Sequence, residues 1–76
     1  MKQKQTVFRR IASNEVVTPE GQILRLQVVE LTDGVVSSLY PLEAEQASTE
    51  WFRGRMVLLK DDDGSVRAYY NYKPIT

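Results

Sequence analysis

Three carboxylates stand side by side in Asp61-Asp62-Asp63-Gly64-Ser65, and this segment invites a calcium-site interpretation. Calcium takes roughly six to eight oxygen ligands, and the loops that bind it space their acids at alternate positions before a distant bidentate Glu. Here the acids are contiguous, so their side chains diverge, and no Glu follows Glu50. We therefore interpret the segment as a solvated hairpin tip and predict no metal site.

A second group of acids, Glu43, Glu45 and Glu50, could in principle supply the paired carboxylates that hydrolyse glycosides. That chemistry needs a cleft around the sugar, and a chain of 76 residues rarely encloses a pocket of about 300 Å³ or more. The chain also contains no His and no Cys, the side chains that most often carry nucleophilic and proton-transfer chemistry. Phosphate loops, dinucleotide fingerprints and zinc signatures are absent from the sequence. We therefore predict a non-enzymatic domain without a cofactor.

Aromatic and basic side chains are combined at Trp51-Phe52-Arg53 and along a final strand from Val66 to Tyr72. Trp and Arg are enriched at binding hot spots, although the single Trp of a small domain is more often part of its core. Aromatic residues with basic neighbours also form the surfaces on which OB-like folds stack single-stranded bases. The residues that would form such a nucleic-acid face are Arg9, Arg10, Arg53, Arg55, Arg67, Tyr70 and Tyr72.

The charges of the chain cancel, with ten basic and ten acidic residues. Their distribution is uneven: residues 1–10 hold four bases and no acid, residues 11–50 one base and seven acids, and residues 51–76 five bases and three acids. A net charge of zero disfavours duplex DNA as a partner, because phosphate neutralisation dominates that binding. The pattern favours pairing across strands between the acidic middle and the basic ends, and its alternative is a basic face built from both ends.

An acidic residue precedes glycine at Glu20-Gly21, Asp33-Gly34 and Asp63-Gly64, each time ahead of a hydrophobic run. Asp-Gly suits the tight type I′ turns of β-hairpins because glycine accepts a positive φ. The spacing predicts one mostly β domain over residues 1–76, with residues 1–5 and 74–76 frayed. Its architecture is expected to be a small, strongly curved sheet or an SH3/OB-like barrel of five to six antiparallel strands.

The central hairpin is expected to pair residues 22–32 with residues 35–42. A two-residue turn at Asp33-Gly34 places Thr32 opposite Val35 and Val29 opposite Ser38. A phase switch at Val28-Val29 predicts either a bulge or a strand covered on both sides. The apolar residues then fall on two faces, Leu24, Leu26, Val28, Val35 and Leu39 on one, and Val29, Leu31, Val36, Tyr40 and Leu42 on the other.

Three local features complete the predicted layout. Residues 43–50 contain no Gly or Pro and several acids near their start, which predicts one short helix between Leu42 and Trp51. Ser13-Asn14 is a candidate turn between two short strands. Gly54, inside an otherwise strand-like run, predicts a bend or a bulge.

We therefore expect a protein-interaction or accessory module that binds a protein partner or a second copy of itself as a homodimer. The expected contact surface is a contiguous apolar patch formed by Val29, Leu31, Val36 and Tyr40, with Trp51. The alternative is an OB/SH3-like domain that binds single-stranded nucleic acid. No apolar run approaches the ~18 residues of a membrane span, and the lysines of the N-terminus precede no apolar stretch. A cytoplasmic location without membrane contact is the resulting expectation.

Overall fold

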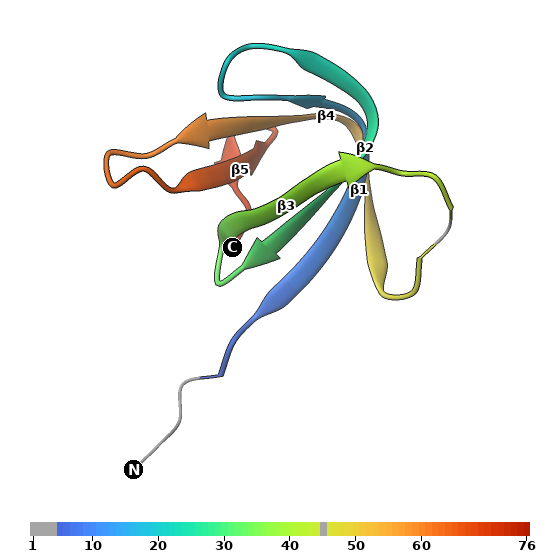
Figure 1. Ribbon diagram of the computed structural model, residues 1–76, viewed down its shortest axis with the longest axis horizontal. Helices are drawn as coiled ribbons and strands as arrows, with labels where there is room; N and C mark the ends of the chain where they lie inside the picture. Colours follow the sequence, from blue (N-terminus) through green and yellow to red (C-terminus); the bar gives the residue numbers. More distant parts are fainter. Residues whose placement is uncertain (1–4, 45) are drawn as a thin grey trace.

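The computed structural model describes residues 5–44 and 46–76, which form one curled six-stranded sheet in the shape of a half-barrel (Figure 1). This confirms the predicted small, strongly curved, mostly β fold. In the described part of the chain there is no helix of the length and apolarity that a membrane crossing requires. The order of the strands across the sheet is β3-β2-β1-β4-β5-β6. Their bounds are β1 Phe8–Val17, β2 Ile23–Thr32, β3 Val35–Pro41, β4 Thr49–Lys60, β5 Val66–Tyr70 and β6 Lys73–Pro74.

The sheet is mixed rather than antiparallel, because β1 and β4 run parallel to each other. The connection between β3 and β4 therefore has to cross the sheet, from Pro41 to Thr49. A short connection suffices, because β3 ends at Pro41, level with Ser13 of β1, and β4 begins at Thr49, beside Arg10 of β1. Those two levels are only roughly 10 Å apart at the rise of a strand. We call residues 42–48 the crossover connection.

The expected short helix between Leu42 and Trp51 is not formed by the described residues, and Glu45 lies outside them. Thr49 and Glu50 already belong to β4, which leaves less than two helical turns of sequence, too few to be stable alone. Ser48 adopts a left-handed φ of 57°. The Ala47 carbonyl accepts a hydrogen bond from Arg10 Nη1 at 2.9 Å instead of one from a helical N–H.

The turn between β2 and β3 has positive φ at both central residues, 51° at Asp33 and 80° at Gly34, as a type I′ turn requires. The predicted pairing of Thr32 with Val35 is confirmed. The register then shifts between Glu30 and Leu31, where β3 carries one extra residue, so that Val29 opposes Leu39 rather than Ser38.

Three adjacent strands are irregular at one level of the sheet. β1 runs through Ser13-Asn14 without the predicted turn, and the register between β1 and β4 shifts there by one residue. Gly54 takes a φ of 99°, donates its N–H to Asn14 Oδ1 at 2.8 Å and accepts a bond from Ser13 Oγ at 2.9 Å. Leu26 has a φ of 51° and is 47% exposed. The predicted bend or bulge at Gly54 is therefore a bulge, whereas Leu26, which the alternation places on an apolar face with Val28, is half exposed.

The hydrophobic core lies on the inner, concave side of the curled sheet. Its buried members come from β1, β2, β4, β5 and the C-terminal end, and they are Ile11, Val16, Val29, Leu31, Met56, Leu58, Ala68 and Ile75. Val28 is as fully buried as Val29, which confirms that β2 is covered on both sides.

The C-terminal residues are part of this core rather than frayed. Ile75 is 7% exposed and donates its N–H to the Ala68 carbonyl at 2.9 Å, and Arg9 Nη1 donates to the Thr76 carbonyl at 2.8 Å. The C-terminus consequently lies beside the β2–β3 turn, where β3 and β5 approach each other (Figure 1). Of the N-terminal residues expected to fray, residues 1–4 lie outside the described residues.

Candidate functional site

The predicted contact surface is divided between the two sides of the sheet. Val29 and Leu31 are 0% and 1% exposed in the core, and Val36 packs against them. The expectation of an exposed patch at these residues is therefore wrong, because the curl of the sheet places them in the core, and the extra residue in β3 puts Tyr40 on the side opposite to Val36. Tyr40 and Trp51 lie on the other side, which we call the outer face.

A row of paired residues crosses this outer face from β3 to β4. Tyr40 pairs with Val28, Val28 with Ala12, and Ala12 with Trp51. Each alternates along its strand with a residue that faces the core or its rim, so all four side chains share the outer side. The two middle members are buried, whereas Trp51 at the end of the row is 50% exposed.

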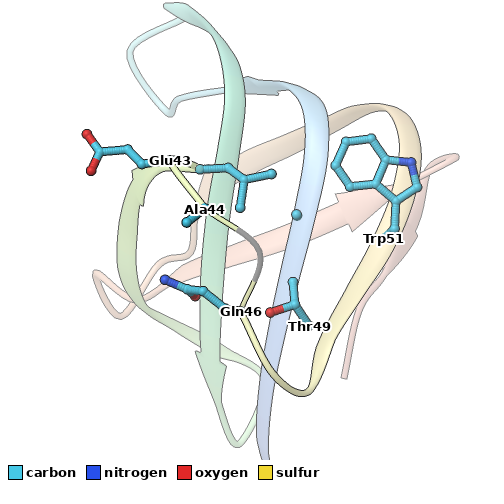
Figure 2. A pocket seen from close by; sticks show the side chains of 7 residues that line it. Glu43, Ala44, Gln46, Thr49 and Trp51 are labelled. Atoms are coloured by element: carbon cyan, nitrogen blue, oxygen red, sulfur yellow. The ribbon is translucent and has the colours of Figure 1, made fainter.

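A pocket of about 500 Å³ lies over this row, between the crossover connection and β4. Figure 2 shows Trp51 on one side of it and Ala44 and Gln46 on the opposite side. The floor includes Ala12, whose methyl group leaves room that a longer side chain would fill. We call this site the outer-face pocket; its lining residues are Ala12, Leu42, Glu43, Ala44, Gln46, Thr49 and Trp51.

A polar network anchors the crossover connection beside the pocket. Glu30 accepts hydrogen bonds from the Tyr40 hydroxyl and, at 3.0 Å, from Arg10 Nε. Arg10 also donates to the Ala47 carbonyl, and the Gln46 amide oxygen lies 3.2 Å from the Tyr40 hydroxyl. These bonds fix Gln46 and Ala47 to the strands below. At the start of the connection, the Leu42 N–H donates to the Leu26 carbonyl at 2.9 Å, so the walls of the pocket are held at both ends.

The same network perturbs two titrating groups. The hydrogen bond from Tyr40, followed by that from Arg10, lowers the pKa of the Glu30 carboxyl below its ordinary value. The Glu30 carboxylate in turn raises the pKa of the Tyr40 phenol. Both groups are thus held in their ordinary charge states at neutral pH, which suits a structural role better than proton transfer.

A second concavity, of about 610 Å³, lies on the β4–β5 hairpin. Leu59 is 48% exposed there and Tyr72 is completely exposed. Asn71 and Tyr72 both take positive φ, 52° and 66°, although a bulky side chain is rare in that conformation. We call this surface the hairpin groove; its lining residues are Arg53, Gly54, Arg55, Val57, Leu59, Tyr69, Asn71 and Tyr72.

The predicted nucleic-acid face is only partly assembled. Arg53, Arg55 and Tyr72 meet in the hairpin groove, whereas Tyr70 turns inward, packs on Phe52 and donates its hydroxyl to the Arg53 carbonyl. Four of the five arginines of this predicted face are paired with carboxylates. The pairs are Arg9–Glu50, Arg10–Glu30, Arg55–Glu15 and Arg67–Asp61. The predicted pairing of the acidic middle with the basic ends accounts for the first three of these contacts.

The acidic hairpin tip has no convergent ligand set. Asp63 accepts the Ser65 N–H at 2.9 Å, and this backbone hydrogen bond is the main reason why the pKa of the Asp63 carboxyl is lowered. Asp61 is engaged by Arg67 Nε at 3.2 Å. Across residues 5–44 and 46–76, no three acidic side chains gather as metal ligands would.

Sequence reasoning missed the floor and the apolar wall of the outer-face pocket. The sequence predicts that a first strand ends at Ala12 and that Leu42 shares a face with Val29 and Leu31, so neither residue is expected at this site. The missing signal was the parallel pairing of β1 with β4, which places Trp51 beside Ala12 and brings Leu42 across the sheet. Comparisons of the chain with protein-family models, with curated proteins and with solved structures gave no significant match.

Proposed function

We propose that this domain is a protein-interaction module that receives an apolar side chain of a partner protein in the outer-face pocket, against Trp51. One observation carries the proposal: the only Trp of the chain stands half exposed at the end of a row whose middle residues are buried. Trp is among the residue types enriched at the hot spots of protein interfaces, and hot spots cluster in well-packed pockets.

The charge around the pocket favours a partner with basic flanks. Glu43 is exposed at the wall and forms no ion pair within the described part of the chain. The described lining residues include this one acid and no Lys or Arg, and nearby Glu50 is already paired with Arg9. A Lys or Arg beside the inserted apolar residue would meet this acidic rim, whereas an acidic neighbour would be repelled.

The remaining candidate functions have less support. The lack of His and Cys, and the absence of any group of three acidic side chains placed as metal ligands among the described residues, weigh against catalysis. Single-stranded nucleic acid is the weaker alternative partner, because four of the five arginines in its predicted face already have carboxylate partners. A phosphate backbone would have to compete with those pairs.

Fluorescence of Trp51 tests the proposal without a label. The probes are a short peptide in which one Leu is flanked by Lys, the same peptide with Glu flanks, and the Lys peptide with Leu replaced by Ser. We expect the first to shift the Trp51 emission to shorter wavelength in a saturable manner, and the other two to bind at least about tenfold more weakly.

Two charge reversals provide the matched comparison. Glu43→Lys should weaken binding of the Lys-flanked peptide, whereas Glu20→Lys, in the exposed turn between β1 and β2, makes the same charge change far from the pocket and should leave it unaltered. Equal weakening of peptide binding by both substitutions would mean that binding depends on the net charge of the protein and not on Glu43. A mixed single-stranded oligonucleotide that binds when none of the peptides does would replace the proposal with the nucleic-acid alternative.

A further inference from the structure

The hairpin groove has an apolar centre and a basic end, and the acidic tip of the β4–β5 hairpin lies beyond its other end. Val57, Leu59 and Tyr69 form its middle, because Val57 pairs with Tyr69 and Leu59 follows on the same side of β4. Leu59 is half exposed and Tyr72 at one end is fully exposed. This surface is separate from the outer-face pocket and shares no lining residue with it.

The charged ends lie in a fixed order along β4. Arg53 and Arg55 stand at the end of the groove near the Gly54 bulge, and Asp61, Asp62 and Asp63 form the hairpin tip just beyond Leu59. Arg53 and Asp62 form no ion pair within residues 5–44 and 46–76. Along the hairpin, two arginines, an apolar strip and an acidic tip that also includes Lys60 therefore follow one another.

We propose that this surface binds a second copy of the chain, with two hairpins packed face to face and antiparallel about a two-fold axis. In that arrangement the apolar strips meet at the axis, and Arg53 of each copy faces Asp62 of the other. A surface whose opposite charges lie on either side of an apolar centre is complementary to itself under a two-fold rotation, as an isologous interface requires.

Other occupants fit this surface less well. A single-stranded nucleic acid would gain Arg53 and the exposed Tyr72, but its phosphates would meet three carboxylates at the tip, and Arg55 is already paired with Glu15 at 2.9 Å. Dimerisation through the free edge of β3 is opposed by its bulge and by Pro41 at its end, both of which hinder strand addition.

Sedimentation velocity of the full chain, from micromolar to near-millimolar concentration, tests the inference with a matched pair of variants. Leu59→Lys places a charge in the apolar strip, and Ile23→Lys changes a residue of similar exposure, 52% against 48%, outside the groove. We expect the wild type and Ile23→Lys to form dimers and Leu59→Lys to remain monomeric. A monomeric wild type throughout this range, or a dimer that survives Leu59→Lys, would overturn the inference.

A charge swap tests the antiparallel geometry itself. Arg53→Asp should weaken the dimer at least about tenfold by facing Asp62 of the other copy, and adding Asp62→Arg should restore it to within about threefold. Failure of the double variant to recover would refute the arrangement. A mixed single-stranded oligonucleotide that adds mass to a monomeric protein would refute it as well. Because peptide binding at Trp51 is measured on a different surface, the two proposals can fail independently.

Discussion

The two faces of the sheet differ in how completely their apolar residues are covered. On the inner face, residues of four strands and the C-terminal end meet in one buried cluster, where Ile11, Val29 and Met56 are completely buried. On the outer face, Ala12 and Val28 are just as buried, but Ala12 lies at the floor of an open pocket and the row that contains them ends at the half-exposed Trp51. We infer from this contrast that packing on the inner face stabilises the domain. The outer face contains a pocket that its own side chains do not fill.

Neighbouring leucines of β4 give the largest contrast. Leu58 is 2% exposed on the inner face and Leu59 is 48% exposed on the outer side. We expect Leu58→Ala to lower the free energy of unfolding by about 2–5 kcal/mol, because it leaves a cavity in the core. Leu59→Ala should cost less than about 1 kcal/mol. Urea unfolding at a concentration where the protein is monomeric measures both, and equal losses would remove the distinction between the faces.

The glycines of the two hairpin turns, Gly34 and Gly64, differ in what surrounds them. Gly34 and Gly64 have similar positive φ, 80° and 88°, so alanine is strained at both. A Cβ at Gly34 would lie 3.1 Å from Arg67 Nη1 beside the C-terminal residues, whereas Gly64 faces open space. Gly64→Ala should cost about 1 kcal/mol and Gly34→Ala about 2 or more. Thermal unfolding of the two variants checks the order, and the reverse order would contradict the packing at the C-terminus.

The pH dependence of stability should involve a carboxylate on each face. The pKa of Glu30 is lowered chiefly by Tyr40, and that of Glu50 chiefly by Arg9. A folded-state pKa below the unfolded value of ~4.3 contributes stability that is present above that pH. That stability is lost as the pH falls through the folded pKa. Tyr40→Phe should therefore raise the pKa of Glu30 and leave that of Glu50 unchanged in a carbon-detected NMR titration. A shift of both would mean that the two faces are electrostatically coupled.

The smallest effect is expected at Leu26, the residue of β2 with a left-handed φ. Its 47% exposure leaves little burial to lose, and Asn tolerates that φ better than Leu does. Leu26→Asn should change the free energy of unfolding by no more than about 0.5 kcal/mol in chemical denaturation. A loss of about 2 kcal/mol or more, typical of a core leucine, would show that Leu26 stabilises the fold after all.

Local sequence signals were sufficient for the turns and for the class of fold. Asp33-Gly34 has the conformation that its residue types favour, Gly54 is at a bulge, and Val28-Val29 is covered on both sides. These features depend on residues close in sequence, so hydrophobic alternation and turn chemistry can predict them.

The remaining features depend on contacts between distant segments. The parallel pairing of β1 with β4, the extra residue in β3 and the burial of Ile75 leave no periodic pattern in the sequence. Residues 43–50 have helical composition, but strand pairing at Thr49 and the bond from Arg10 to Ala47 override that preference. The outer-face pocket arises from these long-range contacts, which explains why the sequence predicts Trp51 and Tyr40 as contact residues but not Ala12.

Quenching of Trp51 fluorescence by acrylamide tests the central claim most directly, because it reports how accessible the outer face is before and after a partner arrives. We predict that the quencher reaches Trp51 readily in the folded protein, and that the Lys-flanked Leu peptide protects it while the Glu-flanked peptide does not. Protection already complete in the free protein, or no change with any peptide, would contradict the view that the outer face is kept open for a partner.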